Sequence, residues 1–411
     1  MQRKILHLLL NAILFADISR AQMRLGVEDA VNRALQSRAS LKAEAARIRA
    51  AEGAKTQARL LPNPEFQFQN ENLRPGQTYT RDVDTLAMIN QPLDILGKRP
   101  ARVAAAQANV EATEADYELA RWRVAQRVRF AYWTARGLQE IRDTLKTTAD
   151  EFQKIVDFNA ARFSTGAIAE QDLLRVRLER ERLQISADTA AIDTDRAVIE
   201  LLREMGQTDF PQVLLTDSLA GAAPPEVPDI DQVLAQRSDI RAARAAVARA
   251  ESNVRVQDVA ARPDLNLLAG FKRTQLPDTT TGVNTAIVTF RMTLPLFDKN
   301  QGNRVAAEAE VRRAQQQLAE LESEIRAEYA GAVQEFRLRQ REFETMLGPL
   351  REHASTISAI ANAAYEQGGV DLLRYLDAER ARLEAQLAWT RGMVEYRQSI
   401  VRLEAAEGVK P

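Results

Sequence analysis

Few residues of this chain have the type and spacing that catalysis or metal binding requires. The 411 residues include no cysteine and two histidines, of which His7 lies in an N-terminal segment that we expect to be removed. His353 is then the only histidine left, and one histidine cannot form a metal site by itself. Glycine-rich phosphate loops, catalytic triads and clustered metal ligands are also missing from the sequence. We therefore predict a protein that is not an enzyme and that holds no cofactor.

Two charged residues near the C-terminus have a spacing that permits an interaction. Arg374 and Asp377 are three residues apart, so a helix would place them on one face, where they can pair. An ion pair on an exposed helical face adds almost nothing to stability. The sequence leaves two interpretations open, an ordinary surface pair and a functional pair. The net charge of −1 gives no reason to expect a nucleic acid as the partner.

The elements that carry these residues belong to an internal repeat. In each copy a long helix opens with Arg-Val-Ala-Ala, at Arg102–Ala105 and at Arg304–Ala307, and the chain then turns at a glycine, Gly166 or Gly368. The offset between the copies is 202 residues at both places. An internal duplication of this kind decides the architecture, because each copy is one structural unit.

The first of the long helices is predicted from about Lys98 to Ala161, a length of roughly 96 Å at ~1.5 Å per residue. Every seventh residue belongs to a series typical of helices that pack lengthwise on one another, namely Val103, Val110, Tyr117, Val124, Ala131, Leu138, Leu145 and Phe152. Glycine can take the left-handed conformation that ends a helix. Gly166 and Gly368 therefore predict hairpins whose second helices return antiparallel.

Short strands with alternating apolar and polar residues precede each long helix. The alternation is clear over Phe66–Asn70, Leu265–Lys272 and Ala286–Leu294, and weaker over Val83–Leu93. Such strands are typical of membrane β-barrels, although a small soluble sheet packed on helices would show the same pattern. Four strands cannot close a barrel, and lipid does not tolerate an open sheet edge. We therefore expect an oligomer, a dimer with eight strands or a trimer with twelve.

The N-terminus has the features of a secretory signal. Arg3 and Lys4 precede the apolar stretch Ile5–Phe15, and Ala21 offers a small residue for cleavage. The alternative, a membrane anchor, would need about 20 apolar residues. We predict export, without lipid on cysteine. The predicted domains are a signal peptide over 1–21, a first repeat over 22–205, a proline-rich linker over 206–228, a second repeat over 229–407 and a tail over 408–411.

Three stretches beside the turns carry further motifs. They are Gln91–Arg99 at a strand-to-helix turn, Arg162–Gly166 with Asp172–Leu174 after it, and Gly368–Ala378. With the duplication and both glycine turns, the predicted mature chain resembles the TolC-like outer-membrane efflux channels over essentially its whole length. The Gly-Lys-Arg and Leu-Asp-Ala pieces within these stretches make it most similar to the CzcC-type branch, the outer-membrane components of heavy-metal resistance pumps.

The resemblance implies a fold that is mainly α with a small β part. Duplicated antiparallel helical hairpins would form an α-barrel in the periplasm, and a homotrimer would place its twelve strands as one β-barrel in outer-membrane lipid. The glycine turns would form a tip that meets a periplasmic membrane-fusion adaptor and an inner-membrane, proton-driven pump of the RND type. The residues implied at this docking tip are Phe163, Gly166, Leu173, Leu174, Gly368, Leu372 and Leu373.

The resemblance also implies a gate at the tip, which opens when the adaptor docks. Asp377 matches a constricting aspartate of the family, and Asp172 and Tyr365 match residues that hold the tip helices together. The sequence departs from the family pattern where Arg374 replaces a second constricting aspartate and Val370 replaces the arginine partner of Asp172. We expect Arg374 either to neutralise Asp377 or to substitute for the missing arginine.

Two classes of function follow. In the first, the protein is the passive outer-membrane duct of a tripartite efflux system, with heavy-metal cations as the expected cargo and drugs or proteins as the alternatives. In the second, it is a periplasmic coiled-coil scaffold or adaptor without a pore. A scaffold does not need strand pairs at the same point of both repeats, so the strands favour the duct.

Overall fold

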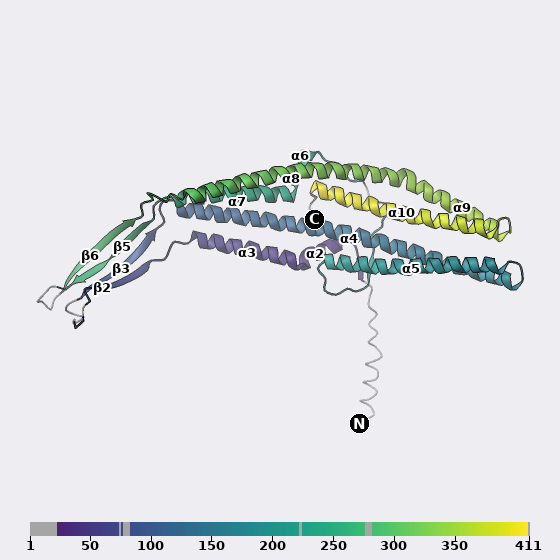
Figure 1. The fold of residues 1–411 in the computed structure, drawn as a ribbon, viewed down its shortest axis with the longest axis horizontal. Coiled ribbons are helices and arrows are strands. Elements are labelled where there is room, and N and C mark those ends of the chain that lie inside the picture. The colour runs from purple at the N-terminus through teal and green to yellow at the C-terminus, as the bar shows by residue number, and fades with distance from the viewer. Residues whose placement is uncertain (1–22, 74, 77–82, 222–223, 276–281, 410–411) are drawn as a thin grey trace, which may run out of the picture. The chain divides into compact units, whose positions relative to one another are not determined.

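The computed structural model describes residues 23–73, 75–76, 83–221, 224–275 and 282–409. The predicted signal peptide and parts of both strand loops lie outside these residues. The described chain is mainly helical, as predicted, with one four-stranded and one two-stranded sheet (Figure 1). It divides into two compact units, and each unit combines parts of both repeats.

One unit consists of residues 43–119 and 238–324 and contains the larger sheet. Its strands pair antiparallel in the order β2 (Glu65–Glu71), β3 (Asp84–Leu93), β5 (Leu265–Thr274) and β6 (Val283–Met292). Its helices are most of α3 (Ala39–Arg59), α7 (Ser238–Ala260) and the first parts of α4 (Lys98–Ser164) and α8 (Gln301–Glu342). Because β3 and β5 come from different repeats, their pairing joins both repeats in one sheet.

The other unit consists of the described residues within 23–42, 120–237 and 325–409. It contains two helical hairpins, which we call the tip hairpins. In the first, the rest of α4 is followed by α5 (Glu170–Glu204), and in the second, the end of α8 continues through η1 (Phe343–Leu347) into α9 (Gly348–Glu366) and returns as α10 (Leu372–Glu407). The unit also holds α2 (Val27–Ser37), α6 (Ile230–Gln236) and a parallel pair of short strands, β1 (Met23–Leu25) and β4 (Val213–Leu215).

The residues of the seven-residue series lie on the side of α4 that packs against other helices, as predicted. Val110, Val124, Leu145 and Phe152 are buried, and the other four members of the series are half-buried. The helix ends at Ser164, slightly beyond the predicted end. A regular apolar row of this length holds α4 against its neighbours over most of its course.

Both glycine turns have the geometry that ends a helix. Gly166 has φ 74° and Gly368 has φ 76°, in the left-handed region. The Gly166 N–H donates to the Phe163 carbonyl at 2.9 Å and the Ala167 N–H to the Arg162 carbonyl at 2.8 Å. The same pair of bonds closes the turn at Gly368. These bonds satisfy carbonyls that a helix end would otherwise leave unpaired.

The long helix of the second repeat changes its helical type once along its length. A π-helical turn, η1, lies between α8 and α9, and the sequence analysis did not predict it. A π-helix has more residues per turn and shifts the apolar face of the following helix. Gly392 of α10 lies against this turn, where a Cβ atom would come within 2.1 Å of Leu347 Cδ1. The absent side chain at Gly392 lets η1 approach α10 closely.

Candidate functional site

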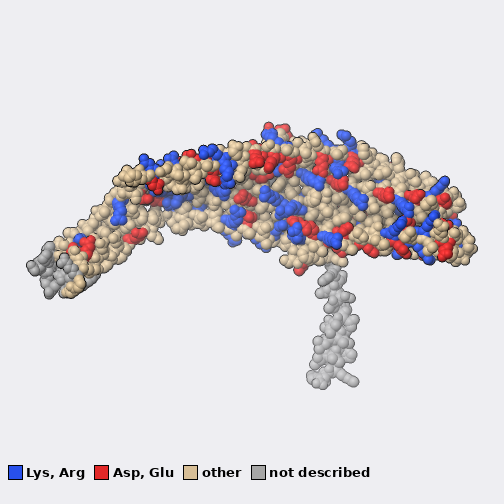
Figure 2. Space-filling view, viewed as in Figure 1, with Lys and Arg blue, Asp and Glu red and all other residues tan. Residues whose placement is uncertain are grey.

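Apolar side chains cover one face of the four-stranded sheet. The register aligns Phe66 with Ile89, Ile89 with Ala269, and Ala269 with Val288 across all four strands. Eight large apolar side chains of this face are between 36% and 75% exposed, whereas Leu265 at the start of β5 is buried; the eight are Phe66, Phe68, Ile89, Leu267, Phe271, Val288, Phe290 and Met292. Figure 2 shows few charged atoms over the strands. An exposed apolar face of this size marks an interaction surface.

The opposite face of the sheet is more polar. It carries Gln67 and Thr289, and Lys272 Nζ lies 2.9 Å from a carboxylate oxygen of Glu71 and 3.4 Å from one of Asp84. A soluble sheet packed on helices would bury its apolar face and expose its polar one. Here β2 and β6 are largely exposed on both faces among the described residues, and no helix buries the apolar face, as in a β-barrel wall in lipid.

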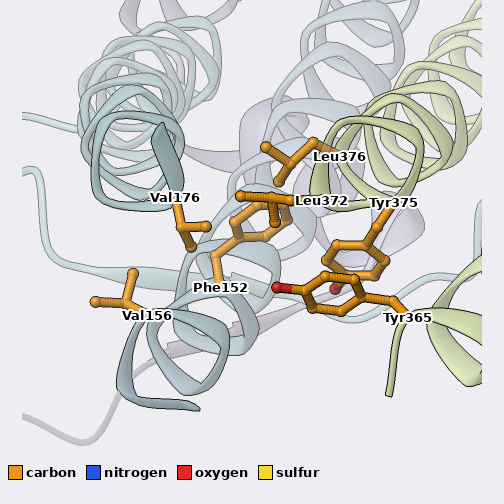
Figure 3. Packing of buried hydrophobic residues seen from close by; sticks show 7 residues of the cluster. All are labelled: Phe152, Val156, Val176, Tyr365, Leu372, Tyr375 and Leu376. Carbon is orange, nitrogen blue, oxygen red and sulfur yellow. The ribbon is translucent and has the colours of Figure 1, made fainter. Parts of the chain in front are cut away.

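The two tip hairpins are held together by one apolar cluster beneath the glycine turns (Figure 3). All four helices contribute to it, and its buried members are Phe152 and Val156 of α4, Val176 of α5, Tyr365 of α9, and Leu372, Tyr375 and Leu376 of α10. Because the cluster joins both hairpins, they cannot separate without exposing it to water.

A buried hydrogen bond inside this region links the hairpins directly. The Tyr365 hydroxyl donates to Asn159 Oδ1 at 2.6 Å, and Asn159 Nδ2 donates to the Ile155 carbonyl at 2.9 Å. The Tyr365 ring stacks on Tyr375, with centroids 5.0 Å apart, and the Arg162 guanidinium lies 5.7 Å from its centroid. Burial raises the pKa of Tyr375 well above its usual range, so this phenol stays neutral.

Two ion pairs join the hairpins nearer the surface. Arg380 of α10 donates from Nε to Glu179 of α5 at 3.3 Å, and Arg382 Nη2 lies 3.4 Å from a carboxylate oxygen of Glu151 of α4. The hydrogen bond to Glu179 raises the pKa of Arg380. Pairs with this much exposure add little stability, but they fix which residues lie side by side.

This geometry can be compared with known proteins. A family model described as outer membrane efflux protein matches residues 30–207 and 230–409, which together make up most of the chain. The chain belongs to the outer membrane efflux protein family. The match confirms the family resemblance that the glycine turns and the duplication indicated.

Two relatives of this efflux protein have names that refer to metal resistance or to cation efflux. The cobalt-zinc-cadmium resistance protein CzcC of Cupriavidus metallidurans is 26% identical over 368 residues, which cover 89% of this chain and 85% of CzcC. The cation efflux system protein CusC of Escherichia coli strain K12 is 25% identical over 322 residues, covering 75% and 69%.

Solved structures share the fold. The outer-membrane channel OprN superposes with a TM-score of 0.73 at 21% identity, covering 93% of this chain and 89% of OprN. A CusC structure gives a TM-score of 0.73 at 19% identity, covering 93% and 92%.

The predicted gate residues of this efflux protein lie around the tip cluster. Tyr365 is buried and donates a hydrogen bond to Asn159 of α4, and Asp172 is half-buried at the start of α5. Arg374 and Asp377 are exposed on α10. They do not form an ion pair with each other. Asp377 Oδ1 instead lies 3.7 Å from Arg380 Nη1, and the backbone N–H of Arg374 donates to the Asp371 carboxylate.

The structure divides the predicted docking residues into two groups. Phe163, Leu174 and Leu373 are exposed beside the turns, whereas Leu173 and Leu372 are buried. The buried pair supports the turns from inside, so only the exposed residues can contact another protein directly. Gly166 and Gly368 have open space around them, since a Cβ atom added to either glycine would meet no neighbouring atom within 4 Å.

Asn159 is the functional candidate that the sequence analysis missed. It continues the seven-residue series of α4, one step after Phe152, and is the first polar residue in it. A polar residue at a fully buried position needs a hydrogen-bond partner, which Tyr365 supplies. That break in the apolar series is the signal that could have identified it.

Two kinds of feature are absent from the described residues. Within them, no group of three or more His, Asp or Glu side chains could hold a metal ion. No helix in the same part of the chain is long and apolar enough to cross a membrane.

Proposed function

We propose that this outer membrane efflux protein is the passive exit duct of a tripartite, proton-driven system that exports heavy-metal cations. The observation that carries the proposal is the exposed apolar face of the four-stranded sheet, built from both repeats of a chain that also forms long helical hairpins. An apolar face of this kind is suited to the lipid of the outer membrane, and the helices are suited to the periplasm.

The proposed assembly is a homotrimer. The sheet has open edges at β2 and β6 among the described residues, and an open edge is not tolerated in lipid. Three copies would supply twelve strands and close one barrel. The exposed residues beside the glycine turns, Phe163, Leu174 and Leu373, would dock a periplasmic adaptor that connects the duct to an inner-membrane pump.

Metal cations are the proposed cargo because the relatives named above are cobalt-zinc-cadmium and cation efflux proteins. Asp377 is proposed to narrow the periplasmic entrance as a ring of three carboxylates, and such rings favour cations. The chain is proposed to reach the outer membrane after export across the inner membrane and removal of the signal peptide.

The test combines deletion of the gene with two variants of one strand. The deletion strain should be more sensitive to cobalt, zinc or cadmium and no more sensitive to hydrophobic drugs. Val288→Asp places a charge on the apolar face and should abolish both outer-membrane recovery and resistance, whereas Thr289→Asp, one residue along on the polar face, should retain both. Wild-type protein in the soluble periplasmic fraction would instead support a scaffold without a pore.

A further inference from the structure

Three cationic side chains lie where α3 and α4 meet the four-stranded sheet. Lys55 and Arg59 belong to the end of α3, and Arg99 belongs to the first turn of α4 (Figure 1). They line one pocket of about 580 Å³, which lies within a single compact unit and which we call the basic pocket. The rest of its lining is uncharged, namely Pro100, Val103, Ala104 and Gln107.

These three cations keep their charge available to a ligand. None of them forms an ion pair with a carboxylate that the structure describes. Asp94, at the start of the same turn, lies 2.8 Å from Arg102 and accepts the backbone N–H of Arg99 at 3.0 Å. The Arg99 Nε donates to the Arg59 carbonyl at 2.7 Å, which ties α4 to α3. Both Nη atoms of Arg99 remain without a described partner, so the pocket offers three positive charges to an anion.

The basic pocket is close to the apolar face of the sheet. Strand β2 begins six positions after Arg59, and β3 ends six positions before Arg99. Ile95 stands between β3 and α4 and is 67% exposed, and Phe66 at the start of β2 is 71% exposed. A set of cations that borders an exposed apolar surface is suited to an amphipathic anion.

A larger pocket on the same two helices shows which side the basic pocket takes. This pocket, of about 890 Å³, reaches Asn266, which lies on the polar face of the sheet with Lys272. The helical residues of its lining include Ala54, Ala58, Lys98 and Arg102. Each of these four stands one position before a residue of the basic pocket.

One position along a helix is a rotation of roughly 100° about its axis. Helix α3 leads into the sheet and α4 leads out of it, so the two helices run in opposite directions (Figure 1). For antiparallel neighbours, the same rotation moves both faces to the other side of the pair. The basic pocket therefore lies on the side opposite the polar pocket, which is the side of the apolar face.

The second repeat shows that the fold does not need these cations. Pro263 stands 199 residues after Pro64, and the Arg-Val-Ala-Ala pair has an offset of 202. By these offsets, the residues that correspond to the three cations are Val254, Asp258 and Gln301. Asp258 is paired with Arg304 at 2.7 Å. The same arrangement of helices and strands thus forms there without a set of three unpaired cations.

We infer that the basic pocket binds the phosphate group of an anionic glycerophospholipid in the periplasmic leaflet of the outer membrane. Guanidinium groups bind phosphate oxygens through paired N–H donors. The acyl chains pass Ile95 and lie against the apolar face of the sheet. This inference rests on the proposed function, which puts the sheet in the outer membrane, and adds a lipid site that fixes how deep the strands sit.

Lipid binding to the purified mature protein tests this site. Native mass spectrometry in detergent counts the lipids bound to each chain while dioleoylphosphatidylglycerol or dioleoylphosphatidylcholine is added. One phosphatidylglycerol per chain should bind several-fold more tightly than phosphatidylcholine, because the choline cation is repelled by the pocket. Added salt should weaken this binding. Equal affinity for the two lipids would overturn the lipid site.

Charge removal locates the site on α3. Lys55→Gln with Arg59→Gln should weaken phosphatidylglycerol binding roughly 25-fold, about fivefold for each basic residue removed. The matched control, Arg249→Gln with Arg255→Gln, removes two exposed charges from α7, the corresponding helix of the second repeat, and should bind as the wild type does. An equal loss in both variants would make binding a property of overall charge and overturn the site. If the first variant does not fold, the lipid preference of the wild type still decides.

Two further measurements separate the source of the phosphate and the two proposals. Displacement of phosphatidylglycerol by inorganic phosphate at millimolar concentration would assign the pocket to a free ion and overturn the lipid site. Membrane fractionation separates the lipid site from the proposed function. Wild-type protein in the outer membrane without a lipid preference would overturn the site and leave the proposed function standing, whereas wild-type protein in the soluble periplasmic fraction would overturn both.

Discussion

Removal of the Tyr365 hydroxyl group should weaken the contact between the two tip hairpins. In Tyr365→Phe the ring remains stacked on Tyr375, but Asn159 Oδ1 loses the donor that lies 2.6 Å away. Asn159 is fully buried, so water does not replace the lost bond. An unsatisfied buried polar group costs about 1–3 kcal/mol. Since about 1.4 kcal/mol is a tenfold change, the equilibrium between joined and separated hairpins should shift by roughly 5- to 150-fold.

Single-channel recording in planar bilayers measures this shift as an increase in open probability, and thermal unfolding measures the lost stability. Tyr375→Phe is the matched control, since it removes a hydroxyl from the same stack that makes no hydrogen bond within the described residues. The control should change both quantities much less.

A double-mutant cycle tests whether the two side chains act as a pair. Asn159→Leu removes the acceptor, and Asn159→Leu with Tyr365→Phe removes both polar groups. The double variant should cost clearly less than the two single variants combined, because no buried group is left unpaired. Additive costs, or equal behaviour of Tyr365→Phe and Tyr375→Phe, would refute the reasoning.

Gly368→Ala should cost about 1 kcal/mol in thermal unfolding because φ is 76°, whereas Gly331→Ala inside α8 should be neutral or stabilising. Burial, with repulsion from a neighbouring glutamate, raises the pKa of Glu407 to about 7. The folded state then binds this proton more tightly than the unfolded one, so stability should fall as pH rises from about 4.5 to about 7, and Glu407→Gln should flatten that dependence in pH-resolved melting. Leu174→Glu or Leu373→Glu should abolish metal resistance while crosslinking still detects trimers, because both side chains are exposed beside the turns. Normal resistance in these variants would place docking elsewhere.

The architecture could be predicted because its signals repeat. Both glycine turns lie 202 residues apart, and the apolar series of α4 runs without interruption from Val103 to Phe152. A turn that occurs twice at the same offset, or an apolar residue that recurs eight times at seven-residue intervals, is unlikely to arise by chance. The alternating strands were ambiguous by themselves, and the register across β2, β3, β5 and β6 was needed to show that Phe66, Ile89 and Val288 share one face.

The details of the tip could not be predicted in the same way, because they depend on how four helices meet. Leu173 and Leu174 are neighbours of identical type, yet one is buried and the other exposed. The partner of Tyr365 lies 206 residues away on α4, and no local pattern connects them. The π-helical turn at 343–347 packs against Gly392 of α10, a contact that a seven-residue count along one helix does not detect.

The central claim is that this protein is the outer-membrane exit for metal cations. The most direct measurement is the rate at which cells preloaded with cadmium, cobalt or zinc release the metal. Deletion of the gene should slow release severely, wild-type protein and Thr289→Asp should restore it, and Val288→Asp should not. Release at the wild-type rate in the deletion strain would contradict the account.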